Sequence, residues 1–324
     1  MLLSLVMLVA GLALLIGGGD ALVRGSVALA TRLRISPTIV GLTVVAFGTS
    51  TPELVVNLTA ALRGTTDIAF GNIVGSNIAN IGLLLGFTAV VMPLTAHRTI
   101  IVREVPMMLL VCLIMLAQAE GAFGGGGHVF TRSDGLILLL LFAVFLYYLI
   151  GDALRQRASD EYVHGMEEKT HQPAMATWLV AALIACGLAA VIGGGHLTVT
   201  GASDLARRLG VPEVVIGLTI VAVGTSLPEF ATNLVAIRRR QPDIAIGNIV
   251  GSNIYNVAFI FGTTATVAPV PLPKGGTIDL LVMAGLSVLL LPFVFTQSRI
   301  SRAEGGLMLA VYIAYVTWLA TRGG

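Results

Sequence analysis

Two stretches of this chain repeat one another, and they decide how the whole sequence is interpreted. One begins Gly41-Leu-Thr-Val-Val-Ala-Phe-Gly-Thr-Ser-Thr-Pro-Glu53, and the other begins Gly217-Leu-Thr-Ile-Val-Ala-Val-Gly-Thr-Ser-Leu-Pro-Glu229. Residues 41–80 and 217–256 match at a constant offset of 176, with 26 of 40 positions identical. Both stretches end in Gly-Asn-Ile-Val-Gly-Ser-Asn-Ile-x-Asn. Because the repeat is sharpest at its polar positions, it indicates a shared chemical role and not only a shared scaffold.

Charge is scarce around these stretches and in the rest of the chain. Of the 324 residues 19 are basic and 17 acidic, or 11%, against roughly 25% in an average soluble domain. Hydrophobic residues make up 56% and the mean hydropathy is +0.93. These values exclude a soluble globular enzyme and a disordered chain, and a net charge of +2 leaves no basic surface for nucleic acid. The sequence predicts a helical membrane protein whose partner is the lipid bilayer.

Apolar runs suited to crossing a bilayer occur ten times. A spanning helix needs about 20 mostly apolar residues. The predicted spans lie near 1–18, 37–62, 68–92, 99–118, 134–151, 175–194, 211–237, 243–269, 277–296 and 303–321. A polar linker at 152–174 separates a first five-helix repeat, 1–151, from a second, 175–324. The predicted fold is therefore all-α, with ten transmembrane helices in two five-helix repeats.

The basic residues set the predicted orientation, since cytoplasmic loops carry an excess of arginine and lysine. The odd-numbered connections carry 13 of the 19 basic residues, and the even-numbered ones with the C-terminus carry 6. We therefore expect a multi-pass protein of the cell's inner (plasma) membrane, with both termini outside and the central loop cytoplasmic. Because five spans is an odd number, the second repeat is inverted relative to the first. Inverted repeats are typical of transporters that bind their substrate near the midplane.

Glu53 and Glu229 each lie deep in an apolar span. A charge at the bilayer centre costs at least ~2.5–3.5 kcal/mol on insertion scales and marks a functional site by default. No lysine or arginine lies in mid-span in this sequence, so the natural partner of these carboxylates is a bound cation.

Pro52 and Pro228 precede the two glutamates. A proline inside a helix removes one backbone hydrogen bond and clashes with the carbonyl four residues back. Helices 2 and 7 are therefore predicted to break at the Gly-Thr-Ser-x-Pro-Glu motifs. Carbonyl groups near 46–48 and 222–224 would then point into a cavity as neutral oxygen ligands.

Further polar side chains recur at helical spacing around the glutamates and on the spans that follow. They are Thr49, Ser50, Asn57, Thr225, Ser226 and Asn233 on the glutamate helices, and Asn72, Ser76, Asn77, Asn80, Asn248, Ser252, Asn253 and Asn256 on spans 3 and 8. Carboxylates, hydroxyls, amides and carbonyls form a hard-oxygen site that suits Ca²⁺, Mg²⁺ or Na⁺. Two carboxylates give a charge of −2, which one Ca²⁺ neutralises. No cofactor is expected beyond these transported ions.

With these doubled motifs the chain resembles the calcium/cation antiporter superfamily, and in particular the bacterial sodium/calcium exchangers. The resemblance implies exchange of Na⁺ for Ca²⁺ by alternating access at one central site, with Glu53 and Glu229 binding both ions in turn. It also implies that spans 1 and 6 slide across a fixed core. The implied additional ligands are Thr49, Ser50, Thr225 and Ser226, the carbonyls of Ala46 and Ala222, and Ser76, Asn80, Ser252 and Asn256.

One position departs from part of that superfamily. In the potassium-dependent branch an aspartate stands at the place of Asn256, whereas here Asn256 and its mate Asn80 are both neutral. This weighs against K⁺ dependence. If more than two Na⁺ replace one Ca²⁺, each cycle moves net charge and responds to the membrane potential. We expect electrogenic extrusion of calcium.

Three other functions stay open at this stage. A Ca²⁺/H⁺ antiporter of the same fold would use the same glutamates, and a passive channel would need flux measurements to exclude. Gly17-x-Gly19-Asp20 matches the pattern of GxGD intramembrane proteases, but the chain lacks the Tyr-Asp dipeptide that such enzymes require. We expect a transporter and not an enzyme, with no obligate protein partner evident and a monomer as the working assumption.

Overall fold

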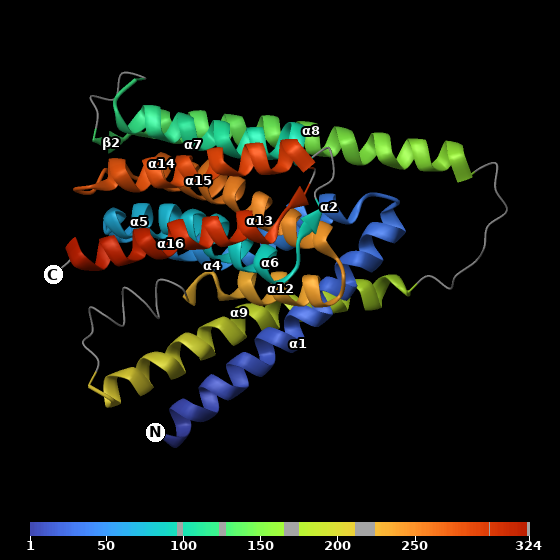
Figure 1. The fold of residues 1–324 in the computed structure, drawn as a ribbon, viewed down its shortest axis with the longest axis horizontal. Coiled ribbons are helices and arrows are strands. Elements are labelled where there is room, and N and C mark those ends of the chain that lie inside the picture. The colour runs from blue at the N-terminus through green and yellow to red at the C-terminus, as the bar shows by residue number, and fades with distance from the viewer. Residues whose placement is uncertain (96–99, 123–127, 165–174, 211–223, 298, 323–324) are drawn as a thin grey trace. The chain divides into compact units, whose positions relative to one another are not determined.

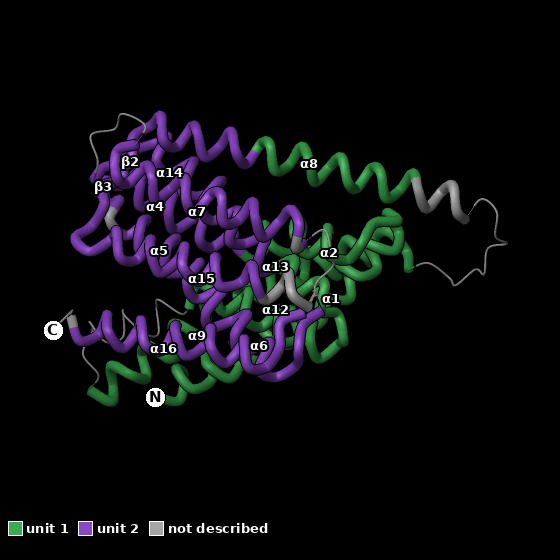
Figure 2. The backbone as a smooth tube through the Cα atoms, turned by 45° about the horizontal axis from the view of Figure 1, so that its top comes forward, with its two compact units in different colours: residues 1–49, 143–248 green, residues 50–142, 249–324 purple. Residues whose placement is uncertain are grey.

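A computed structural model describes residues 1–95, 100–122, 128–164, 175–210, 224–297 and 299–322 of the chain. These residues form helices and four strands of two residues each (Figure 1). The chain forms two compact units (Figure 2). Unit 1 contains residues 1–49 and 143–248, and unit 2 contains residues 50–142 and 249–324. Each unit therefore takes segments from both halves of the sequence, and the repeat boundaries at 1–151 and 175–324 stay a prediction.

Seven of the described helices are long and apolar enough to cross a membrane. They are Leu2–Leu33, Ile68–Val91, Val102–Ala119, Arg132–Ala158, Thr177–Arg208, Pro242–Val267 and Arg302–Thr321. An eighth candidate is the pair Pro37–Thr49 and Thr51–Arg63, which is interrupted at Ser50, and a shorter apolar helix covers Gly276–Pro292. The predicted span at 211–237 lies partly outside the described residues. The protein is thus a multi-pass helical membrane protein, and the number ten stays a prediction.

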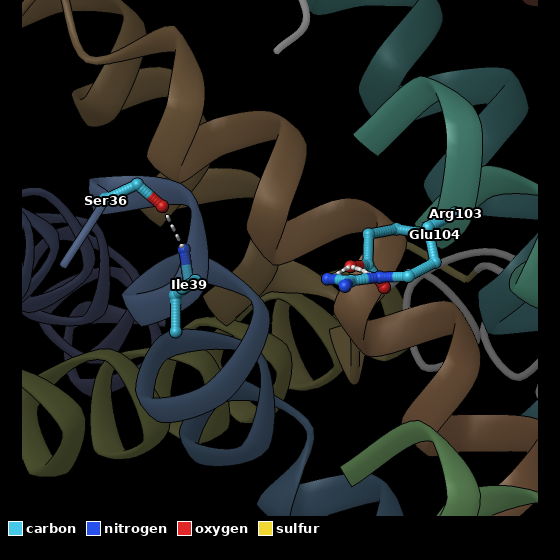
Figure 3. A network of polar contacts seen from close by, with 4 residues as sticks. All are labelled: Ser36, Ile39, Arg103 and Glu104. Carbon is cyan, nitrogen blue, oxygen red and sulfur yellow. Dashed lines mark hydrogen bonds and ion pairs between the residues drawn. The ribbon is translucent and has the colours of Figure 1, made fainter. Parts of the chain in front are cut away.

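Unit 1 is built around two long helices. Its elements are α1 (Leu2–Leu33), α2 (Pro37–Val40), the π-helix η1 (Gly41–Val45), α3 (Ala46–Thr49), the second part of α8 (Arg132–His164), α9 (Thr177–Arg208), α12 (Leu227–Arg238) and the first part of α13 (Pro242–Ile254). The chain after span 5 stays helical as far as His164, so the first part of the range predicted as a linker is helix. Within it, Gln156 Oε1 accepts the backbone N–H of Ser36 at 2.8 Å. Ser36 in turn caps α2 by accepting the N–H of Ile39 at 3.4 Å (Figure 3).

Glycines let α1 and α9 pack backbone against backbone, side by side in Figure 1. A Cβ added at Gly18 would lie 2.6 Å from the Cβ of Ala190, and one added at Gly194 would lie 2.8 Å from the carbonyl oxygen of Gly11. Small residues at such an interface permit close approach of membrane helices. The helix that was predicted near 1–18 is longer, because α1 continues through the glycines at 17–19 to Leu33.

Unit 2 contains the remaining elements. They are α4 (Thr51–Arg63), α5 (Thr66–Ile78), η2 (Ala79–Leu85), α6 (Gly86–Val91), β1 (Leu94–Thr95), η3 (Ile100–Glu104), α7 (Val105–Ala119), β2 (Val129–Phe130), the first part of α8, the end of α13, η5 (Tyr255–Phe261), α14 (Gly262–Val267), β3 (Val270–Pro271), α15 (Gly276–Gln297), β4 (Arg299–Ile300) and α16 (Arg302–Arg322). Its core includes an aromatic cluster in which the rings of Phe130 and Phe261 meet edge to face, 4.9 Å between centroids.

Two small antiparallel sheets join the sequence halves inside unit 2. Leu94 of β1 pairs with Ile300 of β4, and Phe130 of β2 pairs with Val270 of β3. Strands β1 and β3 are mates at the offset of 176. Each sheet therefore ties a strand from one half of the sequence to a strand from the other half.

Two pairs of repeat mates end helices in the left-handed backbone region. Arg34 (φ 56°) is the mate of Gly210 (φ 80°), and Arg240 (φ 56°) is the mate of Gly64 (φ 72°). Glycine adopts this conformation freely, whereas a residue with a Cβ pays roughly 1–2 kcal/mol. Both arginines lie in connections predicted to be cytoplasmic and both glycines in connections predicted to be outside.

Candidate cation-binding site

Glu53 lies in unit 2 in the first turn of a helix. Helix α4 begins at Thr51, and Pro52 occupies one of its first two positions. Proline is tolerated there because its missing N–H would lack an intrahelical partner anyway. Ser50, just before the helix, has the non-helical angles φ −83° and ψ 5°. The positive end of the helix dipole therefore lies beside the Glu53 carboxylate, whose residue is only 1% exposed.

Glu229 has the same local setting in unit 1. Helix α12 begins at Leu227 with Pro228 in its first two positions, and Ser226 before it has φ −90° and ψ 5°. Glu229 is also 1% exposed. Each glutamate is thus a buried carboxylate at a helix N-terminus, where the helix dipole offsets part of the cost of burying the charge.

Unit 2 contains several buried side-chain oxygens that accept no hydrogen bond from the described residues. Asn57, one turn after Glu53, donates its Nδ2 to the Glu53 backbone carbonyl at 2.7 Å. Among the described residues, its Oδ1 then has no hydrogen-bond partner, and the same holds for Asn80 Oδ1, Ser252 Oγ and Asn256 Oδ1. Buried polar atoms are normally satisfied, and oxygens of this kind are the ligands that Ca²⁺ and Na⁺ take. As ligands, these oxygens fit a hard cation.

Unit 1 holds a chain of polar side chains around the other glutamate helix. The Thr49 hydroxyl lies 3.1 Å from Asn248 Oδ1, and Asn248 Nδ2 donates to Asn233 Oδ1 at 3.1 Å. Asn233 lies one turn after Glu229 on α12. This chain fixes α12 relative to α3 and α13 within the unit.

The remaining predicted site residues are placed as follows. Ser76 is buried on α5, Asn72 is half-buried on the same helix, and Ser226 is buried just before α12. The carbonyl of Ala46 lies 3.4 Å from the Thr49 hydroxyl. Thr225 is half-buried, and its Oγ1 has no hydrogen-bond partner among the described residues. Ala222 lies outside the described residues.

Helical spacing does not carry across the interruption at Ser50. Thr49, Glu53 and Asn57 are spaced four residues apart in the sequence, which predicts a common face. Thr49 instead ends α3 in unit 1, whereas Glu53 and Asn57 belong to α4 in unit 2.

Two π-helices are features that the residue pattern did not predict. Asn80 lies in the π-helix η2, and Asn256 lies in the π-helix η5. Such i→i+5 segments are rare and occur often at functional sites. Nothing in the residue composition marks them.

A buried acid is another feature that the residue pattern did not predict. Glu104 is 2% exposed, and Arg103 donates to its Oε1 from Nε at 2.9 Å and from Nη2 at 2.5 Å (Figure 3). Its repeat mate is Leu280. The lack of an acidic mate is the sequence feature that distinguishes Glu104 from Glu53 and Glu229. The adjacent Arg103 neutralises the charge of Glu104.

Asp20, the acid of the protease alternative, also has a basic partner. It forms an ion pair with Arg239 within unit 1. An aspartate engaged in this way serves as a structural contact between α1 and the end of α12.

The chain is similar to several known proteins over nearly its whole length. The sodium/calcium exchanger protein family matches residues 3–151 and 179–321 of the chain. The putative antiporter CaxA of Alkalimonas amylolytica is 36% identical over 319 residues, covering 97% of this chain and 98% of its own. The inner membrane protein YrbG of Escherichia coli is 35% identical over 331 residues, covering 99% and 98%. A structure of the sodium-calcium exchanger NCX_Mj, soaked with Na⁺ and Ca²⁺, superimposes with a TM-score of 0.83 at 29% identity over 98% of both chains.

Proposed function

Because the chain belongs to the sodium/calcium exchanger protein family, we propose that it exchanges Na⁺ for Ca²⁺ across the inner membrane as a secondary active antiporter. The family consists of transporters and not of enzymes. The observation that carries the proposal is the pair of buried glutamates, each in the first turn of a helix and each 1% exposed.

The proposed site takes oxygen ligands from equivalent positions of both repeats. They are Glu53, Glu229, Thr49, Ser50, Thr225, Ser226, Ser76, Asn80, Ser252 and Asn256, with the backbone carbonyls of Ala46 and Ala222. Repeat equivalence supports treating them as one site, since each has a mate at the offset of 176. The donor-free buried oxygens in unit 2 support the choice of a hard cation.

Charge explains why such a site would exchange ions and not leak them. The two glutamates give −2, which one Ca²⁺ or two Na⁺ neutralise. An empty site keeps that charge, and moving it past an apolar gate is costly. If a third Na⁺ joins, each cycle moves one net charge and the membrane potential contributes roughly 2.3 kcal/mol per 100 mV.

The proposed orientation places the odd-numbered connections in the cytoplasm and both termini outside. Excess arginine in those connections supports it. The left-handed helix ends add to that support, because Arg34 and Arg240 occupy strained positions where their mates are glycine. Arg34 and Arg240 thus keep an unfavourable backbone conformation at the two positions where a positive charge would favour a cytoplasmic location.

Transport by the purified protein in liposomes tests the function. An outward Na⁺ gradient should drive uptake of labelled Ca²⁺ in the wild type, and Glu53→Gln or Glu229→Gln should abolish it. Glu104→Gln is the matched control, because it removes a buried glutamate that is already paired with Arg103. Uptake that survives both site substitutions refutes the assignment, and uptake driven by a pH gradient in place of Na⁺ assigns the protein as a Ca²⁺/H⁺ antiporter.

A further inference from the structure

Asn77 on α5 uses both ends of its side-chain amide on the same short stretch of chain. Its Nδ2 donates to the backbone carbonyl of Asn253 at 3.2 Å, and its Oδ1 accepts from Asn256 Nδ2 at 3.0 Å. All three residues lie in unit 2 and are at most 1% exposed. Asn253 lies at the end of α13, where the backbone pattern changes to the π-helix η5. Asn77 is therefore hydrogen-bonded to both sides of the junction between α13 and η5, where Asn256 lies.

These contacts decide which end of the Asn256 amide is left open. The oxygen and the NH₂ group of an asparagine have similar size but opposite polarity, and hydrogen bonding determines which way the amide turns. Here the NH₂ group is engaged by Asn77, so the oxygen remains. Asn256 Oδ1 is buried and has no hydrogen-bond partner among the described residues. The open end is the end that a cation requires.

We propose that Asn77 is a positioning residue that locks the Asn256 amide with its oxygen available as a cation ligand. The inference rests on the proposed function, since it takes Asn256 as a ligand of the transported ion. It explains how a neutral amide serves at this position. A carboxylate presents an oxygen whichever way it turns, whereas an amide that turns over presents a positive NH₂ group and repels the ion.

The repeat mate of Asn77 does not make the equivalent contacts. Asn253 is that mate, and among the described residues neither its Nδ2 nor its Oδ1 has a hydrogen-bond partner. The structure thus assigns the positioning role to Asn77 alone. It also supplies a matched control, because Asn253 is an identical residue at the same depth of burial, 0% exposed like Asn77.

The test combines Asn77→Ala with Asn256→Asp. In Na⁺-loaded liposomes, Asn77→Ala should raise the KM for Ca²⁺ about tenfold, as expected for one lost hydrogen bond to a ligand. The maximal rate at saturating Ca²⁺ should change by less than about twofold, because the glutamates remain. In the Asn256→Asp background the same Asn77→Ala substitution should leave the KM nearly unchanged, since a carboxylate needs no orientation. Asn77→Leu, which keeps most of the volume, repeats the test should Asn77→Ala fail to fold.

The outcomes separate this inference from the proposed function. Wild-type protein that neither binds nor transports Ca²⁺ overturns the proposed function. Wild-type transport with an unchanged KM in Asn77→Ala overturns the positioning role alone. If Asn256→Asp offsets Asn253→Ala as fully as it offsets Asn77→Ala, the rescue is general stabilisation, and the positioning role is also overturned.

Discussion

Asn57 and Asn233 are repeat mates, each one turn after a site glutamate, yet the structure holds them in opposite ways. Asn57 gives its Nδ2 to the carbonyl of Glu53 at 2.7 Å and leaves its Oδ1 open. Asn233 accepts from Asn248 with its Oδ1 at 3.1 Å, and its Nδ2 has no partner among the described residues. Equal sequence therefore does not give equal local structure in the two repeats.

The largest effect on Ca²⁺ uptake is expected from removing either carboxylate. The loss should be similar for the two repeats, although their asparagines are held differently. Glu53→Gln and Glu229→Gln each leave the site with one negative charge. Ca²⁺ then loses one carboxylate oxygen and half of its charge compensation. We expect Na⁺-driven Ca²⁺ uptake to fall by roughly 100-fold or more in both, as when one partner of a buried charge pair is removed. Uptake rates in liposomes measure this. A variant that keeps near wild-type uptake would show that its repeat contributes no essential charge.

Glycines at equivalent positions of α1 and α9 have the same packing in both repeats. A Cβ at Gly18 or at its mate Gly194 would lie within 3.0 Å of the facing helix, whereas Gly17 and its mate Gly193 have nothing within 4 Å. Gly18→Ala and Gly194→Ala should each destabilise the protein by about 1–3 kcal/mol through overpacking. Thermal unfolding in detergent measures this. Gly17→Ala and Gly193→Ala are the controls and should be neutral or stabilising by roughly 0.5–1 kcal/mol.

The asparagine difference itself can be tested by truncation. Asn233→Ala leaves the buried Nδ2 of Asn248 without its acceptor and should cost about 1–3 kcal/mol of unfolding free energy. Asn57→Ala removes only a donor to a backbone carbonyl and should cost about 0.5–1.5 kcal/mol. Both values come from thermal unfolding without ions. Equal losses would mean that the two amides are held alike in solution.

The smallest effect is expected at the left-handed helix ends. Arg240→Gly relieves the strain at φ 56° and should stabilise the protein by at most about 1 kcal/mol, whereas Gly64→Arg should destabilise it by a similar amount. Arg238→Gly is the control, because glycine within α12 costs about 1 kcal/mol. Loss of stability in Arg240→Gly would mean that the arginine side chain contributes more than its backbone costs.

Composition and the doubled motif were sufficient to predict a helical membrane protein of the exchanger family. The scarcity of charge made Glu53 and Glu229 identifiable, because other charges fall mainly in predicted loops or at span ends. Span ends were less predictable. The first span was predicted near 1–18, but α1 continues through glycines 17–19 to Leu33, and Gly18 packs against Ala190 of α9.

What the sequence determined by itself was the repeat, the pair of glutamates inside apolar runs and the asymmetry of the basic residues, since each of these is a property of residue type and order. Tertiary structure decided the orientation of side-chain amides such as that of Asn256, and it decided that Glu104 is buried next to its arginine. Asn77 orients Asn256 from 179 residues away. Glu104 is buried beside Arg103 by the packing of other helices, which the local sequence pattern does not predict. The reason is physical: an amide has two ends of nearly equal size, and only the neighbours that folding brings to it distinguish donor from acceptor.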